Sequence, residues 1–177
     1  MQIEFEVKVL DIDADSVVAK LKALGAEFVE NKDSRRYVYD FTPVNPNSWI
    51  RLREMGGELT LTIKEIEHDG IDGTKELEVD ISDFDSMHAI LQKLGYTPRA
   101  YQENKRASWI LDGVQIEIDS WPMINSYLEI EGENKEAVEE VLKKLDLEDK
   151  VVTSENTTKV YARYGINLHE IKDLRFS

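Results

Sequence analysis

The 177-residue sequence contains no cysteine. Disulfide bonds and thiolate metal sites are therefore excluded. No apolar run approaches the ~20 residues that a helix needs to span a bilayer. There is no P-loop and no glycine-rich dinucleotide turn. The first ten residues, MQIEFEVKVL, alternate in polarity and carry acidic side chains, unlike a signal peptide. We therefore expect a soluble, cytoplasmic protein with no membrane partner.

Positive charge is scarce. Lysine and arginine together number 22 against 36 aspartates and glutamates, so the formal net charge is -14. Binding to nucleic acid by bulk electrostatics needs clustered basic residues, and we expect no nucleic-acid partner. The same acidity would repel a free polyphosphate. Any anion site must therefore use locally placed basic residues or bound metal ions.

Alternating polarity predicts a chain rich in β-strands. The expected strands are Ile3–Leu10, Arg36–Phe41, Trp49–Glu54, Glu58–Glu65, Lys75–Ile81, Arg99–Leu111, Val114–Ser120 and Tyr127–Gly132. Helical spacing, with Asp or Asn available as caps, predicts three helices over Asp13–Leu24, Asp83–Leu94 and Asn134–Leu145. The tail from Val151 onward is mixed.

An internal repeat links the two halves of the sequence. A shift of 70 residues maps Leu24-Gly25 onto Leu94-Gly95, and Arg35-Arg36-Tyr37 onto Lys105-Arg106-Ala107. The repeat predicts one domain over residues 1–177 that is built from two similar β-α-β-β halves. Repeats of this kind point to a symmetric assembly, and a homodimer is among the states that we expect.

The polar faces of the expected strands carry like charges in pairs. Three strands contain Glu-x-Glu and one contains Arg-x-Arg: Glu4-Phe5-Glu6, Glu76-Leu77-Glu78, Glu129-Ile130-Glu131 and Arg51-Leu52-Arg53. A single strand of this kind is typical of a solvated sheet face. Side chains two residues apart point the same way, about 6.5–7 Å from each other, so as a set these pairs repel. Metal between the glutamates and phosphate between the arginines would relieve that repulsion, and about eight strands can close around such ligands.

In order along the chain, these blocks resemble the CYTH, or triphosphate tunnel metalloenzyme, superfamily. That superfamily includes CyaB-type class IV adenylyl cyclases, thiamine triphosphatases and inorganic tripolyphosphatases. The matching blocks are Glu4-Phe5-Glu6-Val7-Lys8, Ile50-Arg51-Leu52-Arg53, Thr62-Ile63-Lys64, Glu76-Leu77-Glu78, Arg106, Glu117-Ile118-Asp119 and Leu128-Glu129-Ile130-Glu131. The resemblance implies an α+β fold, an eight-stranded antiparallel closed β-barrel forming a tunnel, with helices packed outside.

The resemblance also implies roles for individual residues. Carboxylates that would bind Mg²⁺ or Mn²⁺ are Glu4, Glu6, Asp119, Glu129 and Glu131. Residues that would line and grip the triphosphate are Lys8, Arg51, Arg53, Lys64 and Arg106, with Glu76 and Glu78 as further acidic positions and Lys159 as a C-terminal candidate. A catalytic base formed by Lys8 with Tyr37 or Tyr39 is a further hypothesis.

Two departures from the family pattern bear on the reaction. Asn104 stands where the family usually has a lysine, and Thr158–Tyr161 matches the C-terminal Ser-Tyr motif of the cyclases poorly. Because no base-reading pocket is identifiable and the C-terminal motif is degraded, we expect hydrolysis of a small-molecule triphosphate, namely tripolyphosphate, thiamine triphosphate or ATP. The alternatives are a CyaB-type cyclase that converts ATP to cyclic AMP and pyrophosphate, and a binding module without turnover.

Overall fold

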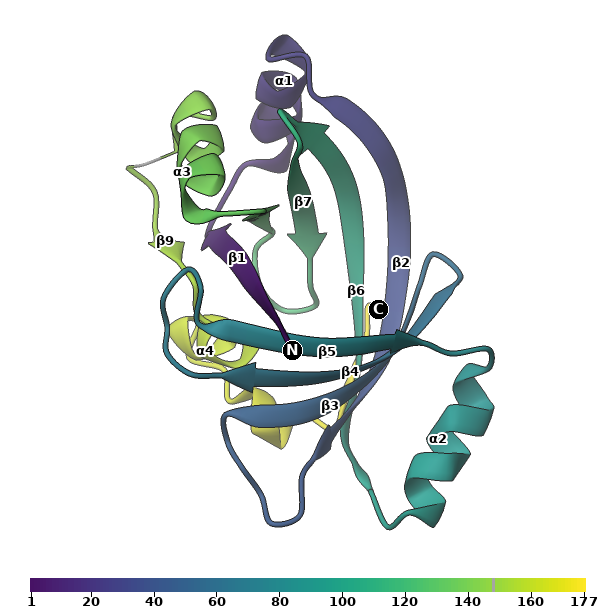
Figure 1. Ribbon diagram of the computed structural model, residues 1–177. Helices are drawn as coiled ribbons and strands as arrows, with labels where there is room; N and C mark the ends of the chain where they lie inside the picture. The colour runs from purple at the N-terminus through teal and green to yellow at the C-terminus, as the bar shows by residue number, and fades with distance from the viewer. Residues whose placement is uncertain (148) are drawn as a thin grey trace.

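The computed structural model describes residues 1–147 and 149–177, and its centre is a closed antiparallel β-barrel (Figure 1). The eight strands of the ring are β1 (Gln2–Val9), β2 (Glu27–Asp40), β3 (Ser48–Met55), β4 (Glu58–Ile66), β5 (Thr74–Asp80), β6 (Pro98–Leu111), β7 (Val114–Ser120) and β8 (Tyr127–Gly132). Hydrogen bonding runs β6-β2-β3-β4-β5-β1-β8-β7, and the pairing of β6 with β7 closes the ring. The fold predicted from the sequence is confirmed.

Three helices form where the sequence predicts them. They are α1 (Ala14–Ala23), α2 (Phe84–Lys93) and α3 (Lys135–Lys144). Each begins after an Asp or Asn whose side chain accepts a hydrogen bond from a backbone N–H of the first turn, as N-caps do. The first two end at Gly25 and Gly95, whose φ angles of 77° and 94° suit glycine.

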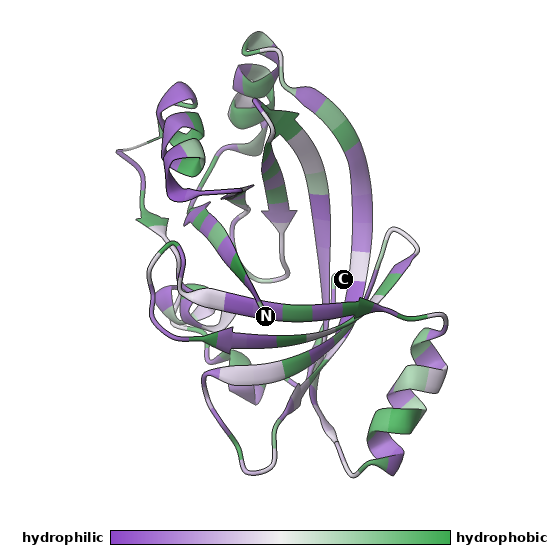
Figure 2. Cartoon of the chain, in the orientation of Figure 1, coloured by the Kyte–Doolittle hydropathy of each residue, from purple (hydrophilic) through white to green (hydrophobic). Residues whose placement is uncertain are grey.

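The helices cover parts of the apolar outer face of the barrel, whereas Leu77 and Val79 of β5 stay exposed (Figure 1). Figure 2 shows hydrophilic and hydrophobic residues alternating along the strands. Leu21 of α1 and Val138 of α3 pack with Ile116 and Ile130 in one buried cluster. A second cluster joins α2 to the outer face of β2 and β3. Because period-two alternation sends the other residues inward, the interior of the barrel receives the polar side chains.

The structure adds elements that the sequence did not predict. β2 begins at Glu27, well before the expected start at Arg36, because its N-terminal part pairs with the long β6 despite weak apolar alternation of its own. A fourth helix, α4 (Thr157–Arg163), forms in the tail. Two short strands, β9 (Val152–Thr153) and β10 (Asp173–Leu174), pair with β1 and β6, and a 3-10 turn occupies Leu168–Glu170.

Throughout the described part of the chain, every helix is too short or too polar to cross a membrane.

Candidate active site: a charged tunnel

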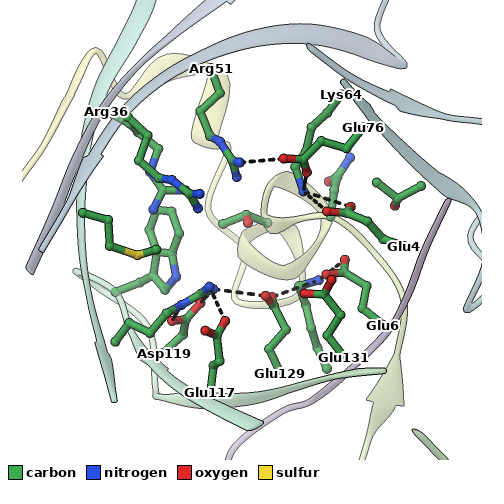
Figure 3. Close-up of a pocket in the computed structure, with 18 of the residues that line it drawn as sticks. Glu4, Glu6, Arg36, Arg51, Lys64, Glu76, Glu117, Asp119, Glu129 and Glu131 are labelled. Carbon is green, nitrogen blue, oxygen red and sulfur yellow. Dashed lines mark hydrogen bonds and ion pairs between the residues drawn. The ribbon is translucent and has the colours of Figure 1, made fainter. Parts of the chain in front are cut away.

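A cavity of about 760 Å³ occupies the inside of the barrel. Figure 3 looks into it and shows acidic and basic side chains converging from all sides. Most of the site residues expected from the sequence line this cavity: Glu4, Glu6, Lys8, Arg51, Arg53, Lys64, Glu76, Glu78, Arg106, Asp119, Glu129, Glu131 and Lys159. Strand alternation therefore brings together groups that lie far apart in the sequence.

One side of the cavity is dominated by carboxylates, and we call it the acidic wall. It comprises Glu6 of β1, Glu117 and Asp119 of β7, and Glu129 and Glu131 of β8. The ammonium of the buried Lys8 sits within this wall, 2.7 Å from Glu6 Oε1 and 3.3 Å from Glu129 Oε2. Burial lowers the pKa of Lys8, but the two carboxylates raise it by more, so the side chain stays charged.

Arg106 is the second cation of the acidic wall. Its Nε and Nη2 donate to the two oxygens of Asp119 at 2.7 and 2.8 Å, in bidentate geometry. Its Nη2 also lies 3.0 Å from Glu129 Oε1, and its Nη1 contacts Glu117. Burial nevertheless raises the pKa of Glu117 to about 7, because Arg106 offsets only part of the desolvation while Glu129 and Asp119 add repulsion.

Lys64 of β4 joins two further carboxylates. Its Nζ lies 3.0 Å from Glu4 Oε2 and 2.7 Å from Glu76 Oε2. Burial raises the pKa of Glu4 to about 8, although the charge of Lys64 acts in the opposite direction. Burial also acts to raise the pKa of the neighbouring Glu76, but the hydrogen bond with Glu4 and the charge of Lys64 lower it, so Glu76 stays ionised. Glu4 and Glu76 are crowded together and share one cation, Lys64. One of the two carboxyl groups therefore tends to hold a proton.

The opposite side of the cavity carries guanidinium groups, and we call Arg36, Arg51 and Arg53 the basic wall. Arg36 of β2 and Arg53 of β3 are directly opposed cross-strand partners. Like charges in such positions destabilise a sheet. Burial and the charge of Arg51 lower the pKa of Arg53 to about 10, even though Arg53 lies 3.5 Å from Glu78. This wall therefore concentrates positive charge in buried side chains on one side of the cavity.

The pairing of β2 with β6 relates these walls to the sequence repeat. Ser34 pairs with Asn104, and the same 70-residue shift that relates the helix ends separates these two residues. Antiparallel pairing about this point gives the two strands a local two-fold relation. Arg36 and Arg106 consequently hold equivalent positions on either side of it.

The strands that follow carry opposite charges at equivalent positions. β3 presents Arg51 and Arg53 to the cavity, whereas β7 presents Glu117 and Asp119. Arg53 pairs across the sheet with the arginine of β2, and Asp119 pairs with the arginine of β6. One half of the barrel thus supplies the basic wall and the other supplies most of the acidic wall.

The two tyrosines expected near Lys8 lie elsewhere. Tyr37 and Tyr39 project from the outer face of β2 toward α2, because Arg36 and Val38 of the same strand face the cavity. The Tyr39 hydroxyl is 2.6 Å from Nδ1 of His88 in α2, and the ring of Tyr37 stacks on the same imidazole at 4.2 Å. The fold does not bring either hydroxyl to Lys8, which corrects the Lys–Tyr pairing expected from the sequence.

The C-terminal segment contributes to the cavity through α4, which lies behind the ring of side chains in Figure 3. Lys159 reaches the lining but is half-exposed, and its Nζ lies 2.5 Å from Asp69 Oδ2. Tyr161 donates to the Pro122 carbonyl oxygen at 2.7 Å, and its ring packs edge-on against Trp121. This helix therefore fixes the position of a cavity-lining tryptophan.

Several charged residues that line the cavity were absent from the expected set, and two of them belong to the acidic and basic walls. Glu117 faces inward two residues before Asp119, so period-two alternation alone includes it. Arg36 faces inward because the aromatic residues of its strand face outward, and that alternation was also visible in the sequence.

The acidic wall has the chemistry of a hard-cation site. In the described ranges, no three acidic or histidine side chains already form a coordination cluster, because their oxygens turn toward Lys8, Lys64 and Arg106. Burial raises the pKa of Glu131, and the carboxylates of Glu129 and Glu6 raise it further. Crowded carboxylate oxygens of this kind are the ligands that Mg²⁺ and Mn²⁺ prefer, so the residues fit a divalent cation.

Comparisons with known proteins agree with this architecture. The CYTH domain family matches residues 2–161. A Methanocaldococcus jannaschii protein provisionally named an adenylate cyclase is 30% identical over 135 residues, or 73% of this chain and 76% of that protein. A conserved hypothetical protein from Pyrococcus furiosus has a TM-score of 0.76 at 25% identity, covering 87% of this chain and 97% of the other. A Hippeastrum protein, described as having a dominant triphosphatase activity, shares the fold with a TM-score of 0.61 at 16% identity, covering 93% and 96%.

Proposed function

Because the chain belongs to the CYTH family, we propose that it is a divalent-metal-dependent enzyme that hydrolyses tripolyphosphate or an organic triphosphate inside the tunnel. The observation that carries this proposal is the opposition of a basic and an acidic wall across one cavity of about 760 Å³. A polyanion and its cations need these two kinds of surface at once. Relatives in the family are named for action on triphosphates, which supports the same substrate class.

In this proposal the basic wall and its neighbours grip the substrate. Arg51 and Arg53 present planar guanidinium groups that match phosphate oxygens bidentately. Lys8, Lys64 and Arg106 are ion-paired with carboxylates in the structure. Phosphate oxygens would compete with those carboxylates for the same N–H donors. Glu76 lies 2.7 Å from Lys64 and Glu78 lies 3.2 Å from Arg51, so these two carboxylates hold the basic side chains in place.

The carboxylates that we assign to Mg²⁺ or Mn²⁺ are Glu4, Glu6, Asp119, Glu129 and Glu131. When bound, the metal would supply positive charge that stabilises the charge developing during in-line transfer. Metal binding by Glu4, Glu6, Asp119 or Glu129 would free the lysine or arginine with which each is paired for the substrate. Lys159 at the cavity margin is assigned to an outer part of the substrate, because it is only half-buried.

A class IV adenylyl cyclase is the second candidate. The relative that is 30% identical carries a cyclase name, and the same grip on triphosphate serves both reactions. The nucleophile separates them, since water gives hydrolysis and the ribose 3′-hydroxyl gives cyclic AMP and pyrophosphate.

Product analysis distinguishes the two reactions. The protein is incubated with Mg²⁺ or Mn²⁺ and, separately, tripolyphosphate, thiamine triphosphate and ATP. We expect inorganic phosphate from at least one substrate and no cyclic AMP. Cyclic AMP with pyrophosphate would favour the cyclase instead, and triphosphate binding that raises the melting temperature without any product would leave only a binding module.

A single substitution tests the assignment of the acidic wall. Glu131→Gln keeps the size of the side chain but removes its charge, and we expect metal-dependent turnover to fall by about 100-fold or more. Glu133→Gln is the matched control, because Glu133 is exposed just beyond the end of the same strand. Full activity in Glu131→Gln, with an unchanged metal requirement, would contradict the assignment.

A further inference from the structure

Among the described residues, Arg36 is the cavity-lining cation whose charge is least compensated. Its side chain lines the cavity, and only 9% of the residue is exposed. Its Nη2 donates to Ser34 Oγ at 3.3 Å and to the amide oxygen of Asn104, both of them neutral acceptors. Its Nε has no hydrogen-bond partner. A guanidinium in water would satisfy all five of its donors, so this arrangement leaves binding capacity unused.

The other lysines and arginines that line the cavity differ from Arg36 in this respect. Each lies within salt-bridge distance of at least one carboxylate: Lys8, Lys32, Arg51, Arg53, Lys64, Arg99, Arg106 and Lys159. Within residues 1–147 and 149–177, Arg36 has no carboxylate partner. Its equivalent across the local two-fold, Arg106, contacts three.

The surroundings of Arg36 oppose its charge. Burial and the nearby guanidinium groups of Arg51, Arg53 and Arg106 together lower its pKa to about 9, although the charge of Asp119 opposes this shift. An unpaired buried charge normally costs a fold several kcal/mol. A group that keeps this cost in the free protein is typical of a ligand-binding position rather than of a structural one.

A second unused donor lies beside it. The guanidinium carbon of Arg36 stacks 4.7 Å above the ring of Trp121, which also lines the cavity and is 4% exposed. The indole Nε1 of Trp121 has no acceptor. The packing of Tyr161 against this ring holds it in place. Trp121 thus holds the Arg36 guanidinium at the wall of the cavity.

We propose that the guanidinium of Arg36, stacked on the face of Trp121, forms an additional oxyanion-binding position, which receives a phosphoryl oxygen of the bound triphosphate. This inference rests on the proposed function and adds a subsite to it. At position 104 of the neighbouring strand stands a neutral asparagine, whose amide oxygen orients Arg36. Where Arg36 and Asn104 meet in the tunnel, the positive charge therefore comes from β2 rather than from β6.

The test compares two substitutions on the same strand. Arg36→Gln removes the inward guanidinium, and Arg35→Gln removes an outward one that pairs with Glu54 at 2.5 Å. Binding of a tripolyphosphate analogue with imido bridges is measured by calorimetry with Mg²⁺ present. We expect Arg36→Gln to weaken binding by about 10- to 100-fold, as for loss of a charged hydrogen bond, and Arg35→Gln to leave it within about twofold.

Stability supplies a readout that a structural role would not produce. Because Arg36→Gln removes an unpaired buried charge, the melting temperature of the free variant should equal or exceed that of the wild type. A lowered melting temperature together with unchanged affinity would show that Arg36 is structural and would overturn the inference. Wild-type protein that does not bind the analogue at all would overturn the proposed function as well, so the two failures are distinguishable.

Two further variants probe the position without relying on that one substitution. Trp121→Leu removes the aromatic ring under the Arg36 guanidinium, and we expect affinity to fall by about two- to tenfold. Arg36→Gln combined with Asn104→Lys moves the charge to the neighbouring strand and should restore part of the affinity lost in Arg36→Gln. Unchanged affinity in Trp121→Leu, or no recovery in the double variant, would count against the assigned position.

Discussion

Arg106 and Arg36 hold equivalent positions in the two halves of the barrel, but their surroundings are opposite. Arg106 is enclosed by Glu117, Asp119 and Glu129, whereas Arg36 is paired across the strands with Arg53 and, among the described residues, has no carboxylate within salt-bridge distance. The same backbone arrangement therefore supports a compensated cation on one side of the tunnel and an uncompensated one on the other. Symmetric strand geometry with asymmetric charge gives a single cavity two different binding surfaces.

The comparison also indicates which charged residues should support the stability of the fold and which should support ligand binding. In the acidic wall, Lys8 and Arg106 are each paired with carboxylates, so removing either cation should harm the fold. In the basic wall, Arg36 has no carboxylate within salt-bridge distance among the described residues, so removing it should harm binding and spare the fold. The following changes test this difference, beginning with the largest expected effect.

Replacing Arg106 with Met should destabilise the protein most. The change leaves three buried carboxylates without their shared cation, and we expect a loss of about 3–5 kcal/mol in the free energy of unfolding near pH 8. Urea unfolding measures it. The loss should shrink at pH 5, where the carboxylates take up protons more readily. A loss below about 1 kcal/mol at both pH values would contradict the difference between the walls.

Glu117→Gln should change how stability depends on pH. Burial raises the pKa of Glu117 from 4.5 to about 7 in the folded protein, so its stabilising contribution is present below pH 4.5 and is lost as the pH rises through 7. Glutamine does not ionise and keeps that contribution. The stability of the variant relative to wild type should therefore rise by about 1–3 kcal/mol between pH 4.5 and pH 8. Thermal or urea unfolding across this range measures it, and an equal difference at all pH values would refute the pKa shift.

Tyr39→Phe should have the smallest effect, and only on stability. It removes the hydroxyl that contacts His88 outside the barrel, at a cost of about 1 kcal/mol. Turnover should stay within about twofold of wild type, because the hydroxyl does not face the cavity. A tenfold fall in kcat with an unchanged melting temperature would restore the Lys8–tyrosine base as a hypothesis.

Much of this tunnel was predictable because charge and alternation reinforce each other. Glu-x-Glu and Arg-x-Arg on strands of period two place their side chains on one face, and thirteen of the fifteen expected site residues line the cavity. Arg36 was not assigned, although its alternation with Tyr37 and Tyr39 indicated an inward side chain. The sequence shows which residues share a face, but not which arginine will lack a partner.

Other features depend on contacts that no local pattern contains. The N-terminal part of β2 forms because β6 lies beside it, with Lys32 opposite Arg106 in the register. The seven-residue α4 is too short to give a clear helical period and is held by packing of Val160 and Tyr161 in a buried cluster. Tertiary contacts decide both elements, so a local pattern does not reveal them.

The position of β1 has a consequence for how the protein folds. Its first residues pair with β5, and its later residues pair with β8, so this strand joins both halves of the ring. Phe5 of β1 and its partner Gly132 of β8 are far apart in the sequence. Closure of the ring must therefore wait until almost the whole barrel has been synthesised. Until then β1 has an unpaired edge. The time needed to synthesise the chain, rather than the time needed to form the strands, would then determine how early the tunnel can form.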